Sequence, residues 1–121
     1  RAEKRLAHWQ GVVIAAAEQC GRSHVPTVVA VRPLRDWLAS KPADALGVML
    51  APAARTRLVE LKPESDQIWL LIGPEGGFSE AETAAAVAAG FAAAALGPRI
   101  LRTETAALTA LAAMQALWGD F

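Results

Sequence analysis

The stretch Asp66-Gln67-Ile68-Trp69-Leu70-Leu71-Ile72, followed by Gly73-Pro74-Glu75-Gly76-Gly77-Phe78, decides the fold. An almost unbroken apolar run that ends in a Gly/Pro segment predicts a central parallel strand covered on both faces. Ser79 and Glu82 stand at capping-box spacing, so a helix is predicted from Ser79 to about Ala89. Strand, glycine-rich loop and capped helix in this order form half of a parallel α/β unit.

The same alternation of strands and helices continues on both sides of this stretch. Further strands are predicted at 25–31, 45–50 and 92–96, and further helices at 1–20, 33–40 and 104–118. Residues 55–60 are predicted as a minor strand or an irregular segment. Thr103 is the predicted N-cap of the last helix, and Leu108, Leu111 and Leu117 are predicted to lie on its buried side. The sequence therefore predicts an α/β domain with a mostly parallel sheet, built as one compact unit.

Composition excludes several classes of protein. Among 121 residues, 54% are hydrophobic and 20% are charged, which is too apolar for a disordered chain. A single cysteine excludes an internal disulfide, and 12 basic against 12 acidic residues leave no global positive field for nucleic acid. Neither a signal peptide nor an apolar run long enough for a membrane span is visible, so we expect a cytoplasmic protein without membrane partners.

The candidate site lies where predicted strands end. Ligands of open α/β sheets bind beyond the carboxyl ends of the strands, and here the loops at 50–55, 73–78 and 97–102 follow strands. Glycines allow a close backbone approach to a ligand, and helix N-termini offer free N–H groups; the alternative is that the glycines serve tight turns only. The pattern matches neither a dinucleotide fingerprint nor a P-loop, and the two histidines and one cysteine lack the spacing of a metal site.

Two segments make the sequence resemble a known family. Ile72–Ser79 and Leu96–Ala106 closely resemble the two signature segments of the RsmE family, and residues 16–22, Val25-Pro26 and Gly119-Asp120 are similar as well. RsmE proteins are S-adenosylmethionine-dependent methyltransferases of 16S ribosomal RNA in the SPOUT superfamily. The resemblance implies a parallel sheet flanked by helices with a C-terminal deep trefoil knot, a homodimer, and methylation of N3 of a uridine in the 30S subunit.

The resemblance also implies roles for individual residues. Those expected to bind S-adenosylmethionine lie in the three loops and the strand ends before them: Leu50, Ile72, Gly73, Glu75, Gly76, Gly77, Leu96, Gly97, Ile100 and Leu101. Arg102 is expected to stabilise a uracil anion, and Glu75 or Glu104 to accept the N3 proton. Several of these residues have a plainer alternative: a salt bridge for Arg102, helix stabilisation for Glu104, a loop hydrogen bond for Glu75, and core packing for Leu50, Ile72, Leu96 and Leu101.

The extent of the resemblance sets the expected domain. Residues 1–121 are expected to form most of a SPOUT methyltransferase domain, without its first strand and helix and without the PUA-like RNA-binding domain that precedes it in the family. Two other functions stay open: a SPOUT methyltransferase that modifies another base or a ribose 2′-OH, and a non-catalytic dimeric module that binds the cofactor.

Overall fold

The computed structural model of this protein describes residues 2–121, and their contacts divide the chain into two compact units. Unit 1 runs to Leu34, and unit 2 spans Arg35–Phe121. The sequence predicted one compact unit over the same residues. The candidate site lies entirely in unit 2.

Unit 1 consists of helix α1 (Ala2–Gln19) and an extended segment that follows it. The predicted strand at 25–31 is wrong, because this segment pairs with no strand of the described chain. A helix side chain takes the place of a neighbouring strand instead. The Gln10 amide accepts a hydrogen bond from the Val28 N–H at 3.0 Å and donates one to the Pro26 carbonyl at 3.4 Å. The β-branched residues therefore signal an extended backbone correctly, but not a sheet.

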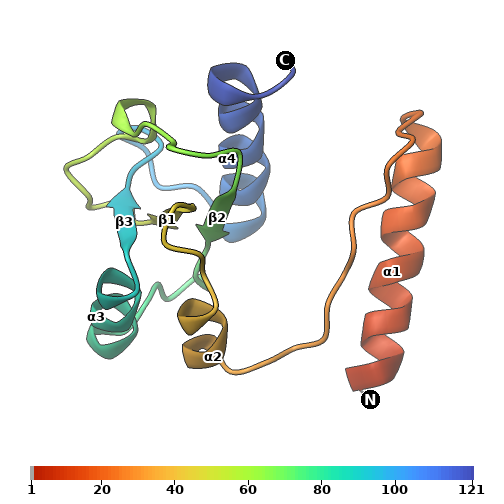
Figure 1. The fold of residues 1–121 in the computed structure, drawn as a ribbon, viewed down its shortest axis with the longest axis horizontal. Coiled ribbons are helices and arrows are strands. Elements are labelled where there is room, and N and C mark those ends of the chain that lie inside the picture. The colour runs from red at the N-terminus through yellow and green to blue at the C-terminus, as the bar shows by residue number, and fades with distance from the viewer. Residues whose placement is uncertain (1) are drawn as a thin grey trace. The chain divides into compact units, whose positions relative to one another are not determined.

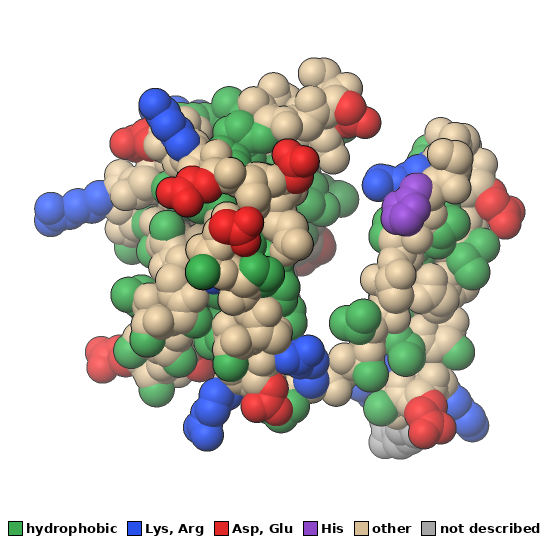
Figure 2. All heavy atoms as spheres, in the orientation of Figure 1, with side chains coloured by type: hydrophobic (Ala, Val, Ile, Leu, Met, Phe, Trp, Pro, Cys, Tyr) green, Lys and Arg blue, Asp and Glu red, His purple; other side chains and the backbone are tan. Residues whose placement is uncertain are grey.

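Unit 1 buries little apolar surface. Ala17 is the buried residue of α1, whereas Trp9 is 55% exposed and Val31 is 94% exposed. Figure 2 shows hydrophobic side chains in green over this unit. The apolar residues of α1 are thus only partly covered, mainly at Leu6, Val13 and Ala17.

Unit 2 is built around a parallel sheet of three strands in the order β2-β1-β3. The elements, in chain order, are α2 (Leu34–Ala39), β1 (Leu46–Leu50), the 3₁₀ turn η1 (Leu58–Glu60), β2 (Ile68–Leu71), α3 (Glu80–Ala88), β3 (Phe91–Ala94) and α4 (Thr103–Trp118) (Figure 1). The most apolar stretch, β2, is an edge strand with only partly buried residues, so its predicted central place is wrong. The central strand is β1, whose Val48 and Met49 are the more deeply buried.

Helices cover both faces of this sheet, as the α/β pattern predicts. On one face, Met114 of α4 packs with Val48 of β1, Ala94 of β3 and Leu58 of η1. On the other face, the Trp37 ring of α2 lies 4.9 Å from the Trp69 ring and 5.5 Å from the Phe91 ring, measured between centroids. Alternate residues of each strand serve the two faces, which is why β1 can be apolar along its whole length.

Helix α4 buries a different side from the one predicted. Ala110 and Met114, one helical turn apart, are its buried residues, whereas Leu108 is 71% exposed and Leu111 is 53% exposed. Leu117 is exposed as well. Met114 packs in the core cluster with the sheet, and Ala110, one turn earlier, is fully buried. The larger leucines form an apolar surface on the outside of α4.

The capping box of α3 is confirmed. The Glu82 N–H donates to Ser79 Oγ at 3.1 Å, and the Ser79 N–H donates to the Glu82 carboxylate at 2.8 Å. We expect Ser79→Ala to lower the free energy of unfolding by about 1 kcal/mol, since it leaves one N–H of the first turn without its partner. Urea unfolding measures this loss. Glu82→Gln keeps an acceptor at the same place and should cost less; an equal loss from both variants would contradict this account.

Candidate functional site

Three loops leave the sheet at one edge, because the strands are parallel and their carboxyl ends lie together. The first loop follows β1 and covers residues 51–57. The second follows β2 and covers residues 72–79, and the third follows β3 and covers residues 95–102. These are the loops in which the sequence placed its candidate site residues.

Backbone hydrogen bonds tie the first loop to the third. The Ala51 N–H donates to the Ala94 carbonyl at 2.9 Å, and the Leu58 N–H donates to the Ala95 carbonyl at 2.9 Å. The Ala95 N–H in turn donates to the Thr56 carbonyl at 2.8 Å, and an isolated parallel bridge joins Arg57 to Ala95. Residues 55–60, predicted as a minor strand or irregular, thus contain both a bridge and a 3₁₀ turn. These backbone hydrogen bonds fix the first and third loops relative to each other.

The second loop folds back over its own start. The Gly77 N–H donates to the Pro74 carbonyl at 2.8 Å, and Gly77 has φ +77°, a left-handed conformation that favours glycine. The ring of Phe78 lies against Gly73, so closely that a Cβ there would stand 3.1 Å from the ring carbons. The shape of the loop itself therefore requires glycine at both positions, whatever further role Gly73 and Gly77 have in binding a ligand.

A cavity of about 290 Å³ opens where the first and second loops meet the sheet. It is lined by Met49, Leu50, Ala51, Pro52, Ala53, Ala54, Gly73, Gly77, Phe78, Thr83 and Ala93. Its wall is mostly apolar, and the third strand and α3 complete it through Ala93 and Thr83. A concave, mostly apolar wall with few polar groups is typical of a small-molecule site.

The structure brings some of the predicted cofactor residues to this cavity and leaves others outside its wall. Leu50, Gly73 and Gly77 line it. The rest are near by in the same loops or strand ends: Ile72, Leu96, Gly97 and Leu101 are half-buried, Glu75 and Gly76 are exposed, and Ile100 is 82% exposed. No atom lies within 4 Å of the places where Gly76, Gly77 and Gly97 would carry a Cβ, so their backbone is approachable.

Sequence reasoning missed the residues that close the cavity from the sheet and from α3. Met49 and Ala93 sit on the same face of the sheet as Gly47 and Phe91, and Thr83 lies on the first turn of α3. The signal for Thr83 was available, because it follows the capping box that opens this helix after the glycine loop. No local pattern could identify Met49 and Ala93, because their place beside the cavity depends on the register between β1 and β3.

The three charged candidates, Glu75, Arg102 and Glu104, are all exposed. Within residues 2–121, no hydrogen bond or ion pair engages the Arg102 guanidinium, so the salt bridge considered for it is absent there. Arg102 is the N-cap residue of α4 but makes no side-chain cap bond. The exposed guanidinium is therefore available to a ligand.

Thr103 is not the N-cap that the sequence predicted. It is the first residue of α4, and its hydroxyl donates to the Gly73 carbonyl at 3.0 Å. The hydroxyl thus joins the start of α4 to the second loop instead of capping its own helix. This contact links segments 30 residues apart, which no local pattern can reveal.

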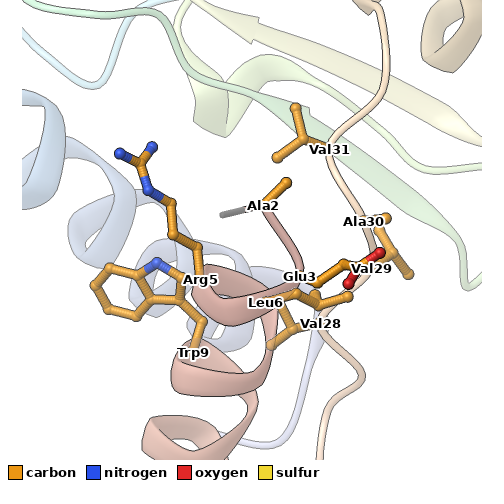
Figure 3. A pocket seen from close by; sticks show the side chains of 9 residues that line it. All are labelled: Ala2, Glu3, Arg5, Leu6, Trp9, Val28, Val29, Ala30 and Val31. Carbon is orange, nitrogen blue, oxygen red and sulfur yellow. The ribbon is translucent and has the colours of Figure 1, made fainter.

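A larger pocket, about 700 Å³, lies in unit 1 between α1 and the extended segment after it (Figure 3). Its lining is mainly apolar, with Leu6, Trp9 and Val28–Val31, and Glu3 and Arg5 at its border. Sequence reasoning did not identify it. It contains no set of converging polar groups, so we place the candidate site at the strand ends of unit 2.

Two further searches covered the described residues. Among residues 2–121, no three His, Cys, Asp or Glu side chains lie close enough together to hold a metal ion. No helix in that same range has both the length and the apolarity that a membrane crossing requires.

Comparison with known families identifies one that covers almost the whole chain. The profile of the RNA methyltransferase domain matches residues 1–115. The ribosomal RNA small subunit methyltransferase E of Buchnera aphidicola is 37% identical over 117 residues, which is 97% of this chain and 48% of the relative. The enzyme of the same name from Mycobacterium bovis is 37% identical over 125 residues, covering 97% of this chain and 47% of the relative. The chain thus spans about half the length of these relatives.

Solved structures agree with the sequence relatives. The crystal structure of ribosomal RNA small subunit methyltransferase E from Neisseria gonorrhoeae, bound to S-adenosylmethionine, has a TM-score of 0.96 and 47% identity, and the match covers 100% of this chain and 51% of that one. A methyltransferase from Legionella pneumophila, also with bound S-adenosylmethionine, has a TM-score of 0.88 and 37% identity, covering 95% and 47% of the two chains. The α/β fold with a parallel sheet is therefore shared with these structures.

Proposed function

We propose, from the premise that this chain belongs to the RNA methyltransferase domain family, that it carries the catalytic part of an S-adenosylmethionine-dependent ribosomal RNA methyltransferase. The observation that carries this proposal is the meeting of the glycine-rich second loop and the first loop around one cavity at the carboxyl edge of the sheet. The names of the relatives point to RNA of the small ribosomal subunit, and two structural neighbours hold S-adenosylmethionine. We assign residues 1–121 to the SPOUT methyltransferase domain.

The residues around the cavity fit this cofactor. Leu50 and Phe78 offer apolar contact for an adenine ring, while the open space around Gly76 and Gly77 leaves their backbone approachable by a ligand. We propose that the remaining predicted residues, Ile72, Glu75, Leu96, Gly97, Ile100 and Leu101, complete the site from the ends of the second and third loops. When bound, S-adenosylmethionine supplies a methyl group on a positively charged sulfur, so that the protein has chiefly to position the acceptor.

The charged residues fit methylation of uracil N3. This nitrogen carries a proton and becomes a good nucleophile only when the proton leaves. We propose that Arg102, free of protein partners within the described chain, stabilises the negative charge on the uracil oxygens. Either Glu75 of the second loop or Glu104 in the first turn of α4, both of which are exposed, accepts the proton.

Finer features of the family complete the proposal. They are a deep trefoil knot in the C-terminal part of the chain, a homodimer, 16S ribosomal RNA of the 30S subunit as substrate, and the cytoplasm as location. The apolar outside of α4, with Leu108 71% exposed and Leu111 53% exposed, supports the dimer, because large exposed apolar patches are typical of protein interfaces. The formal net charge of zero is compatible with RNA binding if other parts of the protein or the partner copy contribute phosphate contacts.

Two measurements test the function. Calorimetry with S-adenosylmethionine and its demethylated product is expected to show binding of both; the absence of binding by folded protein would overturn the proposal. The protein is then incubated with unmodified 30S subunits and S-adenosylmethionine, and the RNA is digested and analysed by mass spectrometry. A methyl group on uracil N3 is the expected product. A methyl group on a ribose 2′-OH or on another base would show that uracil N3 is not the acceptor.

A further inference from the structure

We propose that Thr103 is a positioning residue that couples the second loop, residues 72–79, to Arg102, and this proposal rests on the function proposed above. The Thr103 hydroxyl donates a hydrogen bond to the Gly73 carbonyl at 3.0 Å in a partly buried setting. Gly73 belongs to the second loop, whereas Thr103 is the first residue of α4 and directly follows the third loop. Because the bond is made by a side chain, a single substitution can remove it without touching the backbone.

The accepting carbonyl belongs to a special peptide unit. Gly73 is followed by Pro74, whose nitrogen has no hydrogen, so the carbonyl is the one hydrogen-bonding group of this unit. Gly73 also has no side chain to limit its own rotation. The ring of Phe78 confines Gly73 on one side, and the Thr103 hydroxyl fixes the direction of the carbonyl. Together they set the course of the second loop where it lines the cavity.

The donor is equally well placed. Thr103 follows Arg102 directly and begins α4, so the hydrogen bond holds the backbone of the proposed catalytic arginine against the loop proposed to bind the cofactor. The Arg102 side chain itself makes no cap bond with the helix. Without the Thr103 hydroxyl, no side-chain hydrogen bond would hold the start of α4 against the second loop. Arg102 and the bound cofactor would then be less well aligned, and methyl transfer would be slower.

The test compares Thr103→Val, which keeps the branched shape but removes the hydroxyl, with Thr103→Ser, which keeps the hydroxyl. We expect Thr103→Val to lower kcat for ribosomal RNA methylation roughly tenfold and to raise KM for S-adenosylmethionine several-fold. Thr103→Ser should restore both constants to within about threefold of the unmodified protein. Thr109→Val, on the exposed side of the same helix, is the matched control and should change neither.

Each outcome is decisive. Wild-type constants in Thr103→Val would overturn the positioning role, and so would a Thr103→Ser variant as impaired as Thr103→Val, because packing of the methyl group would then carry the effect. A lower folded fraction with unchanged KM would also overturn it, since that result assigns Thr103 to stability alone. If the unmodified protein neither binds S-adenosylmethionine nor transfers methyl groups, the proposed function itself fails, and the role of Thr103 fails with it.

Discussion

Arg102→Ala is expected to lower the turnover of RNA methylation by roughly 100- to 1,000-fold, the usual effect of removing one group that stabilises a developing negative charge. The affinity for S-adenosylmethionine should stay within about threefold of the unmodified value, because Arg102 is proposed to act on the uracil oxygens. The structure supports a role outside the cofactor cavity, since Arg102 is exposed and does not line that cavity. Single-turnover rates with saturating cofactor, together with calorimetry, separate the two quantities.

Two control variants sharpen this result. Arg102→Lys keeps the positive charge but loses the planar fork of the guanidinium, so it should recover only part of the turnover. Arg99→Ala removes a neighbouring exposed arginine of the same loop, which we expect to touch RNA phosphate or solvent, and it should change turnover at saturating RNA little. Equal losses of turnover and of cofactor affinity in Arg102→Ala would assign this residue to cofactor binding instead.

Local patterns predicted the elements of unit 2 well. The strands at β1, β2 and β3 and the capping box of α3 lie within one or two residues of their predicted places, because each depends on a short apolar run or on side chains three residues apart. The three loops of the site follow from the same patterns, since a parallel sheet collects its carboxyl ends at one edge. The positions of the three loops could therefore be predicted from the sequence.

The errors share one physical origin, which is contact between distant parts of the chain. The central place of β1 depends on which strands pair, and the apolar run of β2 gives no information about that. The predicted buried side of α4 is wrong because Ala110 and Met114, and not the leucines, are its buried residues. Thr103 fits the pattern of an N-cap, but α4 already begins at this residue, and its hydroxyl donates to a carbonyl 30 residues away. In each case tertiary packing decided between options that local chemistry allows.

Leu58 is a core residue that packs against other elements of the chain, and no local pattern identified it. It lies in the segment that the sequence left as a minor strand or irregular, yet it is only 2% exposed and packs with Val48, Ala94 and Met114 in the core between the sheet and α4. Its own N–H donates to the Ala95 carbonyl, which ties the first loop of the site to the third. One side chain therefore supports both the core and the geometry of the loops.

We expect Leu58→Ala to lower the free energy of unfolding by about 2–5 kcal/mol, since it removes buried methyl groups and leaves a cavity that the β-sheet cannot close. Val59→Ala is the matched control, because Val59 is the next residue and is 51% exposed; its effect should stay within about 0.5 kcal/mol. Urea unfolding followed by tryptophan fluorescence measures both, with Trp118 packed against the same core cluster as a reporter. A loss in Leu58→Ala no larger than in Val59→Ala would show that η1 is not part of the core. Because domains of this size are stabilised by about 5–15 kcal/mol in total, a loss in the expected range would remove a large share of the stability on which the site depends.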